Sequence, residues 1–316
     1  MRAACRSRIT PALARLRRAA FAGALLLAAL GGALAALAAS PLTASAEYRH
    51  GDDWRHMYAV LEALKADPPQ RPLVLLLGGS AARECTHTDR RWRRQIAALG
   101  DTPVRAYDLG SASQSFSKKI WMVNELPDVP TLIFIGVNLG RYTAAPPATD
   151  AAVEGLPATS TAVLAASLDD YDQHRFHWPH IASDEKKRQL VGDWLRRRYP
   201  VFKERFSYNA RKLRELVEAC QARGFYPVLL NLPLNLRTVG HRLDKPRARY
   251  RRNCLAVRDR YGVPWVNYIA KIGLRSPDFA DNWHLVEPGR TKWQKRLSIW
   301  TAHFIDLYDL GAPHAG

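Results

Sequence analysis

The sequence predicts an α/β fold in which helices cover both faces of a central parallel sheet. Short apolar runs of strand length alternate along the chain with longer stretches of helical periodicity, and this alternation is typical of such sheets. The chain has 316 residues, of which 47% are hydrophobic, so it is long enough to bury one full core. We therefore expect a single domain behind an N-terminal leader.

The leader is predicted for residues 1–46. The first 18 residues carry six arginines and no acid, and no charged residue follows until Glu47. Ala44-Ser-Ala46 fits the small residues of a signal-peptide cleavage site, whereas residues 21–39 approach the length of a membrane span. We expect a cleaved signal peptide or an uncleaved signal anchor. Both place residues 47–316 outside the cytoplasm, either secreted or anchored to the outer face of the cytoplasmic membrane.

The residues after the leader supply the strands and helices. Apolar runs predict strands at residues 73–77, 104–108, 132–136, 227–231 and 263–267. Helical periodicity is found at residues 53–66, 90–99, 117–126, 208–223 and 247–261. Pro288 and Gly289 mark the start of one more helix.

The chain is strongly basic. Its net charge is +18, which falls to +12 without the six arginines of the leader. For an exported domain this charge favours anionic envelope polymers or an anionic membrane surface. Arginine-rich stretches at residues 186–188, 196–198 and 247–252 could instead follow the phosphates of a nucleic acid. Because they alternate with apolar residues at helical spacing, we interpret them as solvated faces of amphipathic helices and expect no nucleic-acid partner.

Ser80 is the first candidate functional residue. It follows Gly78-Gly79 at the end of the predicted strand 73–77, so the chain presents a serine where open α/β folds bind their ligands. Gly-Gly-Ser is also common in ordinary turns. The serine is therefore a candidate nucleophile only if a base and an oxyanion site lie at the ends of other strands.

A candidate base lies near the end of the chain, in Asp281-Asn-Trp-His284-Leu. A catalytic histidine accepts the serine proton through one ring nitrogen while a carboxylate holds the other nitrogen. One turn of chain brings Asp281 within reach of His284, so a short loop can supply both groups. Taken alone, the two residues could equally be surface groups before a helix.

Four segments together resemble the sequence blocks of the SGNH hydrolases, also called GDSL-type hydrolases. They are Gly78-Gly-Ser80, Gly110-Ser-Ala-Ser113, Gly136-Val-Asn138 and Asp281-x-x-His284-Leu, in the order of the family's four blocks. The resemblance spans about residues 72–300. It implies a flavodoxin-like three-layer α/β/α sandwich around a parallel five-stranded sheet.

The resemblance also implies a role for each of these residues. Ser80 would be the nucleophile, His284 the general base and then acid, and Asp281 the group that orients the imidazole. The oxyanion hole would combine the backbone N–H of Ser80, a backbone N–H from Gly110 or Ser113, and the side-chain amide of Asn138. The family's chemistry needs no cofactor and no metal.

Three departures from the family pattern stand out. The first block lacks the acidic residue of Gly-Asp-Ser, and the third continues with Leu139 where many members have Asp. In the second block, the family's spacing places Ser113 rather than Gly110 at the glycine position. The departures resemble divergent branches that act on O-acyl groups of cell-envelope polymers or exopolysaccharides.

Arg141, just beyond Asn138, could hold an anionic substrate group or be a solvated loop residue.

Residues 141–206 are predicted as an insertion beside the candidate site. The stretch 142–166 is rich in Ala, Pro and Thr, and aromatic residues gather in 171–200. We interpret the insertion as a cap or acyl-chain wall, with a partly ordered surface insertion as the alternative. His174, His177 and His180 are evenly spaced, but Pro179 disfavours a continuous helix, so we expect no metal site.

Two further expectations concern residues outside the four blocks. Arg83 and Glu84 are predicted to form an ion pair at a helix start rather than to act in catalysis. Cys85 is expected to pack in the core, whereas Cys220 and Cys254 could pair in an oxidising compartment.

The sequence as a whole predicts an exported serine esterase that hydrolyses oxygen-ester acyl groups. Its substrate would be an acylated carbohydrate, an envelope polymer or a lipid. One alternative is an O-acyltransferase of the same fold that modifies a cell-envelope polysaccharide. The other is a non-catalytic envelope-binding protein that keeps the fold without turnover.

Overall fold

The computed structural model describes residues 52–146 and 180–311. The chain divides at Glu47, and every described residue belongs to the unit Tyr48–Gly316. The predicted leader and residues 147–179 of the predicted insertion lie outside the described residues. Within the described part, no helix combines the length and the hydropathy that a membrane span requires.

A parallel five-stranded sheet forms the centre of the domain. Its strands are β1 (Leu73–Leu77), β2 (Arg105–Asp108), β3 (Thr131–Val137), β4 (Tyr226–Asn231) and β5 (Trp265–Val266). They lie in the order β2-β1-β3-β4-β5, which is the flavodoxin-like order. In this order the topology reverses between β1 and β3, and ligands of open α/β folds bind at the carboxyl ends beside that point.

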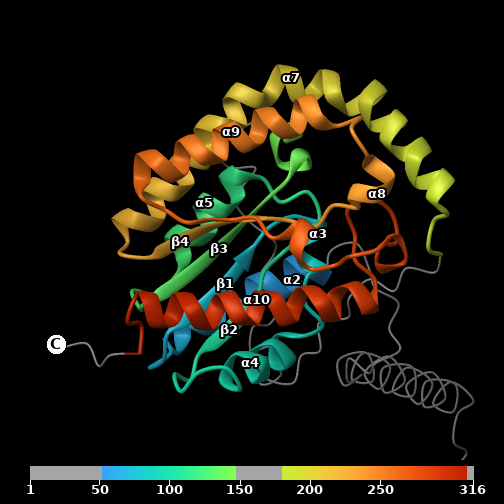
Figure 1. The fold of residues 1–316 in the computed structure, drawn as a ribbon. Coiled ribbons are helices and arrows are strands. Elements are labelled where there is room, and N and C mark those ends of the chain that lie inside the picture. The colour runs from blue at the N-terminus through green and yellow to red at the C-terminus, as the bar shows by residue number, and fades with distance from the viewer. Residues whose placement is uncertain (1–51, 147–179, 312–316) are drawn as a thin grey trace, which may run out of the picture. The chain divides into compact units, whose positions relative to one another are not determined.

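Helices cover both faces of the sheet, as Figure 1 shows. On one face, α4 (Asp89–Ala97) contacts α10 (Glu287–Leu307). On the other face, α7 (Asp184–Ala222) contacts both α5 (Phe116–Glu125) and α9 (Asp244–Tyr261), and α2 (Asp52–Ala66) contacts α5. The three-layer α/β/α fold that the sequence and its resemblance to the SGNH hydrolases predict is therefore confirmed.

Short elements complete the connections at the carboxyl edge of the sheet. They are the helices α3 (Ser80–Arg83) and α8 (Leu236–Val239) and the 3-10 turns η1 (Leu139–Thr143), η3 (Ile269–Lys271) and η4 (Ser276–Asp278).

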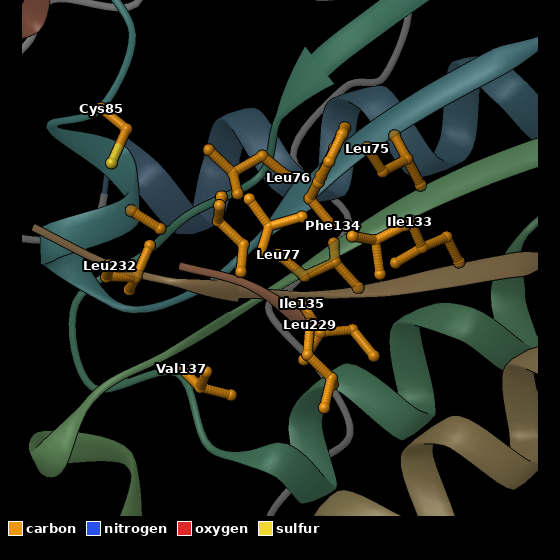
Figure 2. Close-up of a cluster of buried hydrophobic side chains, with 14 of the residues drawn as sticks. Leu75, Leu76, Leu77, Cys85, Ile133, Phe134, Ile135, Val137, Leu229 and Leu232 are labelled. Atoms are coloured by element: carbon orange, nitrogen blue, oxygen red, sulfur yellow. The ribbon is translucent and has the colours of Figure 1, made fainter. Parts of the chain in front are cut away.

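The middle of the core lies around β1, β3 and β4. All five side chains of β1 are buried, and Figure 2 shows Leu75, Leu76 and Leu77 in one apolar cluster with residues of the adjacent strand β3 and of β4 beyond it. Each fully buried leucine stabilises the fold by about 2 kcal/mol relative to an exposed one. Cys85 packs into this core as predicted. Cys220 and Cys254 are both buried and free, so the disulfide that the sequence left open does not form.

The longest helix differs from the prediction. We expected a helix at residues 208–223, but α7 already begins at Asp184, after Ser183 accepts a hydrogen bond from the Lys186 backbone N–H at 3.1 Å. Pro200 lies inside the helix, where it removes one backbone hydrogen bond. The loss is offset because residues on both sides of the proline bury aromatic side chains against the core.

The first half of α7 therefore belongs to the domain core and not to a cap. Trp194, Phe202 and Phe206 are buried, and the Phe206 ring stacks on Tyr142 with 4.9 Å between ring centroids. The predicted insertion thus contains a core helix from Asp184 onward, and the cap interpretation now rests on residues outside the described part of the chain.

A buried ionic network ties α2, α3 and α10 together. Arg83 Nη1 donates to Asp53 Oδ2 at 2.8 Å, and Arg83 Nη2 lies 2.8 Å from Glu84 Oε1. The other oxygen of Glu84, which is fully buried, accepts from Arg290 of α10. Asp53 Oδ2 also accepts the backbone N–H of Ala112, in the loop after β2, at 2.8 Å. The predicted Arg83–Glu84 ion pair is present as part of a larger structural network, but it lies at the end of α3 and not at a helix start.

Replacing Glu84 should destabilise the whole domain. Glu84→Gln leaves the charges of Arg83 and Arg290 buried without their shared carboxylate, and breaking a buried pair in this way costs about 3–5 kcal/mol. Urea or guanidinium denaturation monitored by circular dichroism measures the change. The matched control is Glu62→Gln, whose ion pair with Lys65 is exposed and should contribute about 1 kcal/mol or less. Equal effects of the two substitutions would contradict the structural role of the network.

Candidate active site

Ser80 lies in a tight connection from β1 into α3. Gly79 precedes the helix with φ −82° and ψ −169°, and neither Gly78 nor Gly79 has a left-handed φ. The glycines are therefore needed for space rather than for backbone freedom. A Cβ atom on Gly78 would lie 2.2 Å from Cβ of Ala82, because the helix starts immediately after the strand.

The structure brings the three predicted triad residues together. Ser80 Oγ lies 2.8 Å from His284 Nε2, and His284 Nδ1 lies 2.8 Å from Asp281 Oδ2. Because the carboxylate accepts a hydrogen bond at Nδ1, that nitrogen carries the proton and Nε2 is left to accept one from the serine. These contacts join a serine, an imidazole and a carboxylate in one chain of hydrogen bonds.

The Asp281 carboxylate is kept ionised by its surroundings. Its burial alone would raise the pKa, but the charge of His284 and the hydrogen bond to its ring act in the opposite direction. The backbone N–H groups of Trp283 and His284 also donate to Asp281 Oδ1, at 2.7 and 2.9 Å. The net result is a pKa below the ordinary value of 3.8, which suits a carboxylate that must remain negative beside an imidazole.

The loop that carries Asp281 and His284 is fixed by a buried lysine. Lys187 Nζ donates to the backbone oxygens of Ser276 and Phe279 at 2.7 and 2.9 Å. Asn282 Nδ2 returns a hydrogen bond to the Lys187 backbone oxygen at 2.7 Å. Burial lowers the pKa of Lys187, although Asp184 and Asp281 act in the opposite direction.

Sequence reasoning missed this role of Lys187. We interpreted residues 186–188 as part of a solvated basic face, but the Lys187 side chain is only 1% exposed. The signal that could have found it is its spacing, because Lys187, Val191 and Trp194 follow the i, i+4, i+7 pattern of one helix face. The neighbouring Lys186 and Arg188 are exposed, as predicted.

Asn138 lies beside Ser80 at the end of the neighbouring strand. Leu77 of β1 pairs with Ile135 of β3, and Ser80 and Asn138 each stand three residues beyond that pair. The Asn138 Oδ1 atom accepts the Arg141 backbone N–H at 3.2 Å. The Nδ2 group is therefore the part of this amide that is left to donate to a substrate.

The loop after β2 favours Ser113 over Gly110 as the second oxyanion donor. Among the described residues, Ser113 has the one backbone N–H of residues 110–114 for which we find no acceptor. The other four N–H groups all have acceptors. Gly110 donates to Asp108 Oδ1 and Ser111 donates to the Gly78 backbone oxygen. Ala112 donates to Asp53 Oδ2 and Gln114 donates to the Ser111 backbone oxygen.

Ser113 also has the backbone conformation of a glycine. Its φ is +58°, in the left-handed region that side chains with a Cβ atom disfavour. The SGNH blocks place a glycine at this position, and the structure gives the physical reason for it. The serine keeps the left-handed turn at a cost in backbone strain and retains the N–H donor.

No cluster of metal-binding side chains is found among the described residues. Histidine, cysteine and acidic side chains do not gather there into a group that could hold a metal ion. Of the three evenly spaced histidines, His174 and His177 lie outside the described ranges, so the structure does not address that cluster.

Ser113→Gly should relieve strain. A residue with a Cβ atom in the left-handed region carries about 1–2 kcal/mol of strain. Glycine removes this strain, but it loses more backbone entropy on folding, which offsets about 0.5–1 kcal/mol of the gain. We expect the free energy of unfolding to stay equal or to rise by up to about 1 kcal/mol, as measured by chemical denaturation. The control is Ser115→Gly, which removes the cap of α5 at an ordinary φ of −83° and should lower stability. The opposite ranking of the two variants would contradict strain at Ser113.

The lowered pKa of Asp281 makes a prediction about acid stability. A carboxyl whose pKa is lower in the folded than in the unfolded state stabilises the fold above its unfolded value and loses that contribution as the pH falls through its folded value. Between about pH 5 and pH 3, the protein should therefore lose more unfolding free energy than Asp281→Asn does. Denaturation curves at several pH values measure both profiles. Parallel profiles would show that Asp281 does not have a lowered pKa.

Comparisons with known proteins find similarity in structure but not in sequence. No model of a protein family matches the chain, and no curated protein matches it. Among solved structures, the chain is similar to a GDSL-like lipase from Bacteroides thetaiotaomicron, with 11% identity and a TM-score of 0.40 over 79% of this chain and 99% of the other.

Two more solved structures are similar to the chain at the same level. The acetylxylan esterase Axe2 from Geobacillus stearothermophilus matches with 11% identity and a TM-score of 0.43, over 77% of this chain and 95% of the other. The protein YxiM from Bacillus subtilis matches with 10% identity and a TM-score of 0.40, over 76% of this chain. The chain spans only 58% of the length of YxiM.

Proposed function

We propose that this protein is a serine hydrolase of the SGNH type that acts on oxygen esters. The observation that carries the proposal is the chain of hydrogen bonds from Ser80 through His284 to Asp281, with 2.8 Å at each step. Serine, imidazole and carboxylate in this order form the arrangement that activates a hydroxyl group for attack on an acyl carbon. A domain that only binds envelope polymers has no need for this geometry.

The proposed reaction has two halves. Ser80 Oγ attacks the ester carbonyl carbon while His284 Nε2 accepts the serine proton. The ester's alcohol then leaves with that proton, and an acyl-serine remains. In the second half His284 takes a proton from a water molecule, which attacks the acyl-serine, and the carboxylic acid is released as Ser80 recovers its proton.

Three donors are available for the negative charge that develops on the carbonyl oxygen. Ser80 lies at the start of α3, where a backbone N–H has no acceptor within the helix. Ser113 contributes the N–H that its loop leaves without an acceptor, and Asn138 contributes Nδ2. Losing one donor of such a hole typically costs about 3–4 kcal/mol in barrier height.

The substrate we propose is an acylated carbohydrate, an envelope polymer or a lipid outside the cytoplasm. Two features of the sequence support this class: the predicted leader at residues 1–46, and a net charge of +12 on the remainder, which attracts anionic polymers and membrane surfaces. The protein would be secreted or anchored to the outer face of the membrane, as the sequence predicts.

Labelling with a fluorophosphonate probe tests the proposed nucleophile. The purified protein should become labelled at Ser80, because the probe phosphonylates a serine that a neighbouring base activates. Ser80→Ala should abolish the label, and His284→Ala should reduce it by at least about 10³-fold, since the base is lost. Peptide mass spectrometry identifies the labelled residue.

The control for this experiment is Ser117→Ala, which removes a partly buried hydroxyl that bonds Tyr208 and lies outside the triad. Its labelling should equal that of the wild type. Turnover of p-nitrophenyl esters from acetate to palmitate, beside acetylated polysaccharides, then identifies the acyl group and the alcohol. A folded wild-type protein that neither labels nor hydrolyses any ester would refute the proposed function.

A further inference from the structure

We infer that Arg141 and Gly79 form a matched pair that positions the oxyanion hole, with Arg141 as a positioning residue. The inference rests on the proposed function, because it concerns the same site. Neither residue belongs to the proposed triad or to the three oxyanion donors. Their contacts nevertheless connect the segments that carry all three donors.

Arg141 contacts two of these segments through hydrogen bonds. Its backbone N–H donates to Asn138 Oδ1 at 3.2 Å and to the Asn138 backbone oxygen at 3.1 Å, so it sets the orientation of the Asn138 amide. Its side chain reaches the loop after β2, where Nη1 donates to the backbone oxygen of Gln114, the residue that follows Ser113. One residue thus links the Asn138 donor with the segment that carries the Ser113 donor.

The third contact is with Gly79, directly before Ser80. A Cβ atom on Gly79 would lie 2.6 Å from Cζ and Nη2 of Arg141 and 3.0 Å from Nη1. The guanidinium therefore occupies the space that a side chain at position 79 would fill. Any residue can adopt the φ of −82° and ψ of −169° found at Gly79, so its backbone conformation does not demand glycine. Glycine leaves the space that the neighbouring guanidinium occupies, and a larger residue at this position would displace the guanidinium.

This contact gives a physical reason for the unusual first block. The SGNH family has an acidic residue where this chain has Gly79, and this chain fills the same place with Arg141 of η1, the turn that follows β3. Gly-Gly-Ser is therefore not a loss of the family pattern at this position. It is one half of a pair, and Arg141 is the other half.

Among the residues that the structure describes, no acidic side chain forms an ion pair with Arg141. Its Nε atom is buried and has no hydrogen-bond partner among the described residues. Burial lowers the pKa of the guanidinium to about 10, so it stays positive at neutral pH. Burial and the charge of Arg141 together lower the pKa of the fully buried Lys119, which donates to the Gly136 backbone oxygen at 3.2 Å. A cation fixed here favours the negative charge of an oxyanion on the same edge.

A double-mutant cycle tests the pair. Arg141→Ala should lower kcat for ester hydrolysis on the order of 10-fold to 100-fold with little change in KM, because the donors lose their relative positions. Gly79→Ala should give a similar loss, since its methyl group displaces the guanidinium. The double variant should be no slower than Arg141→Ala alone, because the methyl group then fills vacated space.

Two further measurements separate positioning from general damage. Millimolar guanidinium ion should restore part of the activity of Arg141→Ala but none of the activity of the double variant, whose methyl group blocks the vacated space. The melting temperature should fall for Gly79→Ala in the wild-type background and stay unchanged when the same substitution is made in Arg141→Ala. The control is Arg205→Ala, which removes a hydrogen bond to the Thr143 backbone oxygen at 3.2 Å and should leave kcat unchanged.

Several results would overturn the inference. If the fold-loss of kcat in the double variant equalled the product of the two single fold-losses, the two residues would not share one space. A rise in KM confined to anionic substrates, with kcat unchanged, would make Arg141 a substrate-binding group instead. Wild-type activity in Arg141→Ala would refute the pair and leave the proposed function standing, whereas an inactive wild type would refute both.

Discussion

The buried carboxylate of Glu84 is the interaction on which the rest of the site depends. It lies between Arg83 and Arg290, so it joins the short helix that begins with Ser80 to the helix that follows His284. Through Arg83 the same network reaches Asp53, which accepts the N–H of Ala112 in the loop that carries Ser113, the second oxyanion donor that we propose. Parallel strands only bring these segments to one edge of the sheet. The network fixes their separations, and hydrogen-bonding catalysis requires fixed separations.

Most of the fold could be predicted from the sequence because local patterns determine it. The run Leu73–Leu77 is a strand at the predicted residues, since five consecutive apolar side chains must be buried on both faces of a sheet. The early start of α7 could not be predicted in this way, because Pro200 interrupts the local signal and packing against Tyr142 outweighs it. Tertiary contacts determine where such a helix begins, and a local sequence pattern does not report those contacts.

Part of the candidate site could likewise be predicted from local sequence patterns, and part could not. The positions of Ser80, Asp281 and His284 follow from short motifs at strand ends, and the structure brings their side chains within hydrogen-bond distance. The choice between Gly110 and Ser113 needed the partners of each backbone N–H, and no sequence pattern reports those. Lys187 and Arg141 contact distant backbone oxygens, which a sequence pattern does not report. The sequence therefore suggested a solvated charge for Lys187, and a substrate-binding or solvated residue for Arg141.

The distance in sequence between Ser80 and His284 has a consequence for how the protein comes to be active. The two residues stand 204 positions apart, and every strand of the sheet lies between them or just before them. A chain that is still being synthesised holds Ser80 without His284. Under the proposed function, the serine becomes reactive only when the loop that carries His284 has docked, so the nucleophile and the completed fold appear together.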